Sequence, residues 1–250
     1  MREIPCNLCK GDFKEELFFL NNFRIVKCKN CGLVFVDPQP EKEEIEQFYK
    51  THQNFYLERY NRKKISKLKR SEKDIKRIQK FLKSKCNFSK ISLLDIGCGC
   101  GFLLKSASDI GWDVCGIDIS ESEVKYAKTQ FGVNAKVAHF PEEVNLPHYF
   151  FNVITMFDLI EHLPNPFKGL KKCFHLLYPG GFLVIGTPNI QHFKAKRLKE
   201  KWLDLKPPEH LFYFSFSTLK SLCEKAGFKY IGSFFKFPWK EGIKAVFQKP

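Results

Sequence analysis

The chain has 250 residues, of which 44% are hydrophobic, and its 42 Lys and Arg against 27 Asp and Glu give a net charge of +15. This composition excludes a disordered chain and a fibrous repeat, and the length allows a full hydrophobic core. No apolar run approaches the roughly 18 residues of a membrane helix, and the N-terminus lacks the apolar stretch of a signal peptide. We therefore expect a cytoplasmic protein, whose ten cysteines act as metal ligands, catalytic thiols or small core residues.

Two pairs of cysteines lie near the N-terminus, Cys6 with Cys9 and Cys28 with Cys31. The two-residue spacer within each pair lets both sulfurs face one point, so four thiolates can surround a metal at about 2.3 Å. Zinc suits four cysteines best, and such a site is structural because no ligand position is open to water. Free thiols, another metal or a redox pair are the alternatives. We predict a small zinc ribbon over residues 1–37.

Residues 38–90 form a charged segment with a helical pattern. Apolar residues recur at helical spacing at Ile65, Leu68, Ile75, Ile78 and Leu82. Ser71 with Asp74 resembles a helix start. Between Arg59 and Lys85, thirteen basic residues stand against two acidic ones, so this stretch carries eleven of the fifteen net charges. We interpret it as a linker with a solvated helix face, and the alternative is an electrostatic footprint for RNA or an acidic partner.

Residues 91–250 alternate short apolar strands with amphipathic helices. We expect strands at 91–96, 114–119, 133–139, 152–157 and 182–186, and helices at 102–110, 121–131, 166–177 and 217–226. Strict alternation predicts an α/β fold with a parallel sheet covered on both faces. The alternation of strands and helices ends near the C-terminus, where residues 230–237 and 243–248 can pair as an antiparallel hairpin.

A glycine loop follows the first of these strands, with glycines at 97, 99 and 101. A dinucleotide-binding loop would have its third glycine at position 102, which is Phe102 here, so the pattern weakens a reading as an NAD site. Glycines let the backbone approach a ligand closely, and Asp118 ends the next strand 21 residues after Gly97, where an acid accepts hydrogen bonds from ribose hydroxyls. The order of strand, loop, helix, strand and acid predicts a nucleoside ligand.

The fourth strand ends in Phe157-Asp158-Leu159-Ile160-Glu161-His162-Leu163-Pro164. These acids and the histidine should face the cleft beyond the carboxyl ends of the strands, where open α/β sheets bind ligands. The alternative is a purely structural role, in which Glu161 and His162 cap the following helix and hold the loop in place.

Together, Asp95-Ile96-Gly97-Cys98-Gly99-Cys100-Gly101, Gly116-Ile117-Asp118, Glu161-His162-Leu163-Pro164 and Tyr178-Pro179-Gly180-Gly181 resemble the class I S-adenosylmethionine-dependent methyltransferases. The resemblance covers residues 91–250 and implies a Rossmann-like seven-stranded sheet whose last strand is antiparallel. It also implies the residues that contact the cofactor: Asp95, Gly97, Cys98, Gly99, Gly101, Asp118, Ile119, Phe140, Phe157 and Asp158.

A four-cysteine ribbon ahead of this domain, with Glu209-His210 behind it, is similar to the zinc-ribbon methyltransferases of sugar and small-metabolite pathways. In the deoxysugar C-methyltransferases, a His after strand four and a downstream Glu-His pair serve the substrate, which maps to His162, Glu209 and His210. Pro207 replaces a Tyr expected before that pair, and the further C-terminal domain of those enzymes has no counterpart here. Asp158, Glu161 and His162 also resemble the strand-four end of ubiquinone-type O-methyltransferases, which implies a possible divalent cation site.

Methyl transfer is an in-line displacement, so the protein has to align the acceptor and remove a proton. A histidine titrates near neutral pH, and we predict His162 or His210 as the base, with Glu161 orienting the imidazole. The expected acceptor is a sugar, nucleotide-sugar or other metabolite, methylated on oxygen or carbon. The alternatives are an RNA methyltransferase that uses the ribbon and the lysine helix to bind phosphates, and a non-catalytic scaffold that only binds the cofactor. No base-amine or Pro-Cys signature favours RNA.

Overall fold

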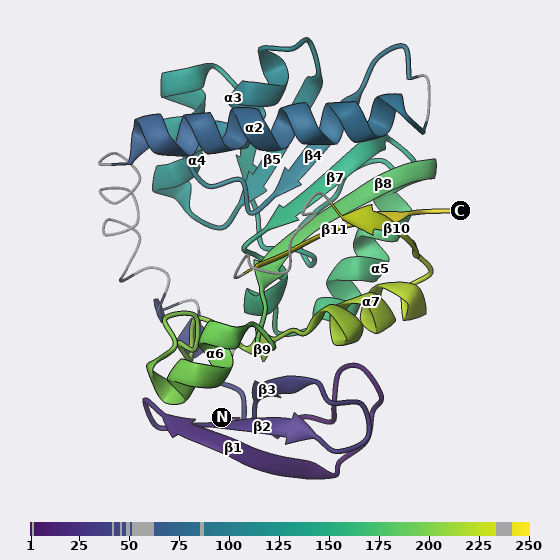
Figure 1. Ribbon diagram of the computed structural model, residues 1–250. Helices are drawn as coiled ribbons and strands as arrows, with labels where there is room; N and C mark the ends of the chain where they lie inside the picture. Colours follow the sequence, from purple (N-terminus) through teal and green to yellow (C-terminus); the bar gives the residue numbers. More distant parts are fainter. Residues whose placement is uncertain are drawn as a thin grey trace.

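The structure is a computed structural model, and it describes residues 1, 3–41, 43–45, 47–48, 51, 63–85, 88–233 and 242–250. Its larger sheet has seven strands in the order β10-β11-β8-β7-β4-β5-β6 (Figure 1). In chain order these strands are β4 (Ser92–Ile96), β5 (Asp113–Asp118), β6 (Ala135–Val137), β7 (Phe151–Phe157), β8 (Leu177–Pro188), β10 (Lys229–Ser233) and β11 (Gly242–Gln248). β4 to β8 pair in parallel, whereas β11 is antiparallel to both of its neighbours. The expected α/β sheet with an antiparallel last strand is confirmed.

The helices are α2 (Lys64–Lys83), α3 (Phe102–Ser108), α4 (Glu121–Phe131), α5 (Pro166–Leu176), α6 (Phe193–Leu198) and α7 (Phe216–Lys225), with 3₁₀ turns η1 (Ile160–His162) and η2 (Lys199–Lys201). The predicted boundaries differ from these by a few residues. The expected strand at 133–139 keeps only Ala135–Val137, since β6 is an edge strand with one partner. The expected strand at 182–186 lengthens to Leu177–Pro188 because Leu177 pairs with Phe151 of β7 and β11 pairs with the strand as far as Pro188. Residues 234–237 of the predicted hairpin lie outside the described residues.

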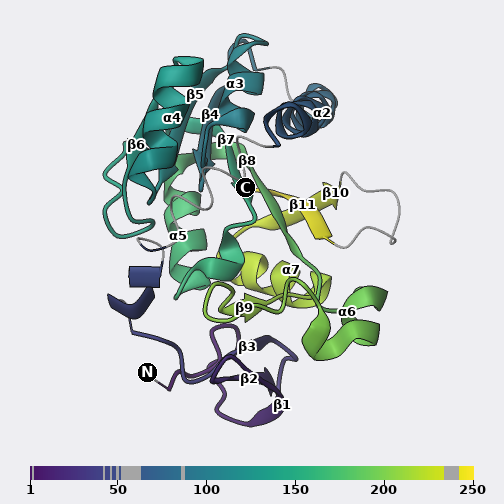
Figure 2. The ribbon, with the colours of Figure 1, turned by 90° about the vertical axis from the view of Figure 1, so that its left-hand side faces the viewer.

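One face of the large sheet is covered by α2 and α3 (Figure 2). Ile75, Ile78 and Leu82 of α2 pack in one cluster with Leu93 of β4 and Val153 of β7. Successive strand residues point to opposite faces, so the next residues along these strands join the core on the other face, under α5 and α7. The apolar stripe of the charged segment is thus buried against the sheet.

Two expectations for this helix are wrong. The helix begins at Lys64 and passes through Ser71 without a break. Asp74 is no cap residue, because it is buried and forms an ion pair with Lys244 of β11. Ile65 lies before the point at which α2 reaches the sheet core, and its side chain is 72% exposed.

A smaller sheet combines the N-terminal segment with a strand from the C-terminal half of the chain (Figure 2). Its four antiparallel strands are β1 (Lys14–Leu20), β2 (Phe23–Cys28), β3 (Val34–Val36) and β9 (Phe212–Tyr213). Phe35 of β3 is fully buried and stacks on Phe212 of β9, with ring centroids 6.1 Å apart. The cysteine-bearing segment is thereby attached to the stretch of chain that directly follows His210.

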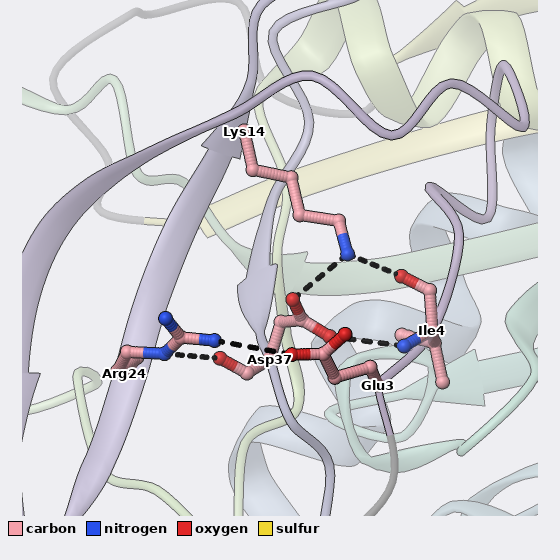
Figure 3. Close-up of polar contacts among 5 residues, drawn as sticks. All are labelled: Glu3, Ile4, Lys14, Arg24 and Asp37. Atoms are coloured by element: carbon pink, nitrogen blue, oxygen red, sulfur yellow. Dashed lines mark hydrogen bonds and ion pairs between the residues drawn. The ribbon is translucent and has the colours of Figure 1, made fainter.

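A buried carboxylate fixes the first residues against this small sheet (Figure 3). Asp37, directly after β3, accepts hydrogen bonds from the Ile4 backbone N–H at 3.0 Å and from the Lys14 ammonium at 2.8 Å. Lys14 also donates to the Ile4 carbonyl at 2.8 Å, and the Arg24 guanidinium donates to the Asp37 carbonyl at 3.2 Å. Charge-assisted hydrogen bonds of this kind are stronger than neutral ones. They hold residues Glu3 to Pro5 beside the large cavity described next.

Among the described helices, none combines the length and the apolarity required to cross a membrane.

Candidate active site

A cavity of about 2040 Å³ opens beyond the carboxyl ends of β4, β5 and β7. It is lined by the glycine loop, by the residues that follow β5, by α2 and β11, and by the chain around residues 204–210. Ligand pockets usually enclose about 300–1,000 Å³. The cavity therefore has room for two molecules side by side, as a group transfer requires.

The glycine loop is bound to the neighbouring strand by its backbone. The N–H groups of Gly97 and Cys98 donate to the Ile117 carbonyl at 2.8 and 3.1 Å. Gly97 has φ +74, and a Cβ there would lie 3.1 Å from Leu159, so only glycine fits without strain. Gly101 also has a positive φ. A Cβ at this position would lie only 2.7 Å from the Cβ of Ala127, so the absence of a side chain allows α4 to pack here. Gly97 thus shapes the cavity, whereas Gly101 permits helix packing.

Two carboxyl groups support this loop from the strands below. Asp118 ends β5 and accepts hydrogen bonds from the N–H groups of Gly99 at 2.7 Å and Ser120 at 2.9 Å. Asp95, the last residue but one of β4, is buried and accepts a hydrogen bond from the Thr155 hydroxyl at 2.6 Å. Burial, with a smaller contribution from the charge of Asp118, raises the pKa of Asp95 to about 7. Asp118 keeps acceptor capacity on both carboxylate oxygens, which suits a ribose diol.

Glu161, which also lines the cavity, is buried in η1. Its Oε2 accepts a hydrogen bond from the Thr187 hydroxyl at 2.9 Å, and its Oε1 has no hydrogen-bond partner within the described part of the chain. Burial, and then the nearby charge of Asp158, raises the pKa of Glu161 to about 8. An orphaned buried carboxylate oxygen is costly unless a ligand or ion completes it.

Two imidazoles lie beside Glu161 with their rings perpendicular and their centroids 4.7 Å apart, namely His162 and His210. His210 Nδ1 donates to the Asp204 carbonyl at 2.8 Å, and His162 hydrogen-bonds the Glu209 backbone. A ring that donates to a carbonyl keeps its other nitrogen as an acceptor. Burial is the main cause that lowers the pKa of both histidines below 6.5. Both rings are therefore neutral near pH 7 and can act as bases or metal ligands.

The chain connects this cluster to the small sheet. The Leu211 N–H donates to the Glu161 carbonyl at 2.9 Å, and the Val36 N–H donates to the Leu211 carbonyl at 2.8 Å. The buried Tyr213 hydroxyl donates to the His210 carbonyl at 3.0 Å. Because β9 pairs with β3, the position of His210 depends on the cysteine-bearing segment.

The four N-terminal cysteines come together as expected. Sγ of Cys6 lies 3.4 Å from Sγ of Cys31, Sγ of Cys9 lies 3.4 Å from Sγ of Cys28, and all four sulfurs are within 4.8 Å of one another. A tetrahedral ion with bonds of about 2.3 Å needs sulfur–sulfur edges of about 3.8 Å. The observed separations fit such an ion after small side-chain shifts.

The sequence and the fold match known proteins at this point. A family model described as a methyltransferase domain matches residues 56–232, which is more than half of the chain. The chain belongs to this family. Its methyltransferase fold is that of class I, S-adenosylmethionine-dependent enzymes.

Individual relatives agree with this assignment. A ubiquinone biosynthesis O-methyltransferase from Coxiella burnetii is 33% identical over 121 residues, or 46% of this chain and 51% of that protein. The chain thus spans about half the length of the curated relatives it matches. A possible histamine N-methyltransferase from Thermotoga maritima has a TM-score of 0.59 at 20% identity, covering 81% of this chain and 100% of that one. A TehB-like methyltransferase from Corynebacterium glutamicum has a TM-score of 0.58 at 18% identity, covering 80% and 99%. At these identities the structural likeness shows the fold alone.

Most residues that we predicted for the cofactor line the methyltransferase cavity: Asp95, Gly97, Cys98, Gly99, Asp118, Ile119, Phe140, Phe157 and Asp158. Gly101 does not line the cavity, for the packing reason given above. The four predicted catalytic residues line the cavity as well: Glu161, His162, Glu209 and His210. Glu209 forms an ion pair with Lys206 at 2.9 Å.

The predicted set of cation ligands is altered by the structure. Glu161, His162 and His210 bring ligand atoms within 4.8 Å of one another, whereas Asp158 is not in this group. The Asp158 carboxylate is 59% exposed and lies 3.9 Å from the Arg70 guanidinium. The charge of Asp158 still acts on Glu161, but its carboxylate is not among the ligand atoms that lie within 4.8 Å of one another.

Sequence reasoning missed several residues of the site. Thr155 and Thr187 are buried partners of Asp95 and Glu161, and nothing in a strand pattern distinguishes such a threonine from a packing residue. Glu123 is buried beside Asp118, and burial followed by that charge raises its pKa to about 8. Ser120 caps α4 by accepting a hydrogen bond from the Glu123 N–H, and Glu123 also lines the cavity. The side of α2 that faces the cavity was missed too.

Proposed function

We propose that this methyltransferase transfers the methyl group of S-adenosylmethionine to a small-molecule acceptor, with His162 or His210 as the general base. The observation that carries the proposal is the pair of neutral imidazoles beside a buried carboxylate, in the same cavity as the glycine loop. The names of the curated relatives, which refer to O-methylation in ubiquinone biosynthesis, support a small acceptor for this chain.

The residues present fit this cofactor. Asp118 would accept hydrogen bonds from its ribose, and the loop around Gly97 allows close backbone approach, while Phe140 and Ile119 offer apolar surface. When bound, the cofactor supplies a methyl group on a sulfonium, which is an electrophile. The remaining task of the protein is to hold the acceptor in line and to exclude water.

An acceptor hydroxyl or acidic carbon loses its proton to the acceptor nitrogen of His162 or His210. Each ring donates its other N–H to a backbone carbonyl, which holds its orientation. Glu161 lies beside both rings. The positive charge of the imidazolium that forms would favour the ionised form of the Glu161 carboxyl group, which would stabilise that charge in turn. A divalent cation held by Glu161, His162 and His210 is the alternative use of the same groups, and it would bind the acceptor oxygen directly.

We further propose that Cys6, Cys9, Cys28 and Cys31 hold a structural zinc ion. With four thiolate ligands the ion would have no open position, and its role would be to stabilise the small sheet that supports β9.

The test compares His162→Ala and His210→Ala with the parent protein, using S-adenosylhomocysteine binding by calorimetry to confirm that the cofactor site is intact. We expect one or both variants to lose methyl transfer by about 100-fold or more with cofactor affinity retained. Unchanged rates in both variants would contradict the assignment of the base. Loss of activity on dialysis against a chelator, with restoration by a divalent metal, would favour the cation.

A further inference from the structure

The first pair of cysteines lies in a tight turn that forms part of the cavity wall. In this first turn, residues 6–11, the Lys10 N–H donates to the Cys6 carbonyl at 2.8 Å. Asn7 and Lys10 line the cavity. The chain directly before the turn is held in place by Asp37 (Figure 3). The cysteine-bearing segment therefore contributes side chains to the methyltransferase cavity.

The second pair of cysteines lies in an equivalent turn, residues 28–32, with one difference. There the Gly32 N–H donates to the Cys28 carbonyl at 2.9 Å, and the φ of Gly32 is +78. Lys10 occupies the same position of the first turn with a φ of +64, which glycine adopts readily and lysine adopts at a cost. Lys10 lines the cavity, whereas Gly32 does not. Of these two equivalent positions, the one that meets the cavity is the one with a side chain.

The Asn7 side chain is 8% exposed, and its amide is oriented by α5. The Phe167 N–H donates to Asn7 Oδ1 at 3.3 Å, and because a backbone N–H can only donate, the other amide atom is the nitrogen Nδ2. Nδ2 has no hydrogen-bond partner within the described residues. It is not one of their fully enclosed unpartnered atoms, which belong to Gln39 and Glu161. The N–H groups of this buried amide are therefore open to the cavity that Asn7 lines.

The Lys10 ammonium is a second donor group in the same turn. Its side chain is exposed and forms no ion pair or hydrogen bond within the described part of the chain. The cavity-lining carboxylates of the N-terminal segment and of the loop after β6 have cationic partners, apart from exposed Glu43: Glu3 with Arg24, Glu41 with the N-terminal ammonium and Glu142 with Lys168. The Lys10 ammonium is thus available to a ligand.

We propose, resting on the proposed function, that the methyl acceptor carries a carboxylate that binds between Asn7 Nδ2 and the Lys10 ammonium. Both groups donate hydrogen bonds and neither accepts one, so they select a group that only accepts. A carboxylate has one oxygen for each donor group, and its charge strengthens both hydrogen bonds. α5 begins four residues after His162, and Asn7 is bonded to the first turn of α5. The carboxylate subsite therefore adjoins the chain that carries the proposed base.

The experiment measures binding of benzoate, with uncharged benzamide for comparison, by ligand-observed NMR to the full chain saturated with S-adenosylhomocysteine. Asn7→Asp/Lys10→Met keeps an acceptor for the Phe167 N–H but removes both donor groups. The control Lys29→Met/Asn30→Asp makes the same substitutions in the second turn, where neither residue lines the cavity. We expect saturable binding of benzoate but not of benzamide to the parent. Benzoate binding should be weaker by about tenfold or more in the first variant and unchanged in the control.

Lys10→Gly separates ligand recognition from folding. This variant copies Gly32 of the second turn and suits the positive φ, so the thermal midpoint should stay unchanged or rise while benzoate binding weakens. A lower midpoint with parental benzoate affinity would show that Lys10 only holds the turn, and would overturn its role in the subsite.

Other results would also overturn the inference. They are absence of saturable benzoate binding to the parent, equal binding of benzamide, equal weakening in both double variants, and tighter binding of inorganic phosphate than of benzoate at these residues. A methylated product that couples no amine through a carbodiimide, and so has no carboxyl group, would do the same. Failure of S-adenosylhomocysteine to bind, with benzoate binding still dependent on Lys10, would instead contradict the proposed function and leave the carboxylate subsite standing.

Discussion

Replacing Asp118 with alanine removes the carboxylate that ends β5 beside the glycine loop. A carboxylate offers about four acceptor positions, and the N–H groups of Gly99 and Ser120 use one on each oxygen. The Ile119 backbone also hydrogen-bonds this carboxylate, which leaves at least one position for a ribose hydroxyl. A hydrogen bond to a charged group contributes about 1.5–3 kcal/mol, so its loss should weaken binding by a factor of about 10–100.

The assay is calorimetric titration with S-adenosylhomocysteine, and Asp113→Asn is the matched control. Asp113 begins the same strand, and its exposed carboxylate pairs with exposed Lys90 at 2.7 Å. Such surface pairs contribute about 0–1 kcal/mol, so the control should bind the ligand as the parent does. Asp118→Asn should lie between the parent and Asp118→Ala. Near-parental affinity in a folded Asp118→Ala protein would refute the assignment of Asp118 to the cofactor.

Three further predictions concern the base, the zinc site and the buried ion pair. Because burial lowers the pKa of His162 and His210 below 6.5, protonation should abolish activity only under more acidic conditions; a kcat/KM profile that already falls above pH 6.5 would contradict this. Cys9→Ser should lower the zinc content and the methyl-transfer rate but not cofactor affinity, since the small sheet supports His210 through β9; equal loss of both functions would argue for general unfolding. Lys244→Met should destabilise the fold by about 3 kcal/mol in urea unfolding, and adding Asp74→Leu should restore part of this loss; an additive effect of the two changes would contradict their coupling.

The large sheet was predicted well because the spacing of hydrophobic residues and the glycines at turns can be recognised from neighbouring residues alone. The strand from Ser92 to Ile96 and the helix from Glu121 to Phe131 need only neighbouring residues to be recognised. The length of β8 could not be predicted, since pairing with β11 extends it to Pro188. The same applies to α2, whose start was wrongly assigned from a cap pattern at Ser71 that the ion pair between Asp74 and Lys244 overrides.

The site was only partly predictable for a related reason. Glu161 and His162 follow a strand and could be found locally, whereas His210 was named only through a family resemblance. The fold brings it to them by the hydrogen bond between Leu211 and Glu161. The lysine helix was interpreted as a solvated face because a charge count does not tell which side of a helix meets a cavity. Five of its thirteen basic residues line the cavity.

Methyl transfer to a small molecule by the imidazole pair is tested most directly with S-adenosylmethionine carrying a trideuterated methyl group. The protein is incubated with a metabolite extract and, separately, with RNA, and mass spectrometry follows the label. We predict label in the low-molecular-weight fraction with the parent protein and its loss in the variant carrying both His162→Ala and His210→Ala, while S-adenosylhomocysteine binding is retained. Label confined to RNA, or equal labelling of metabolites by the parent and this variant, would contradict the account.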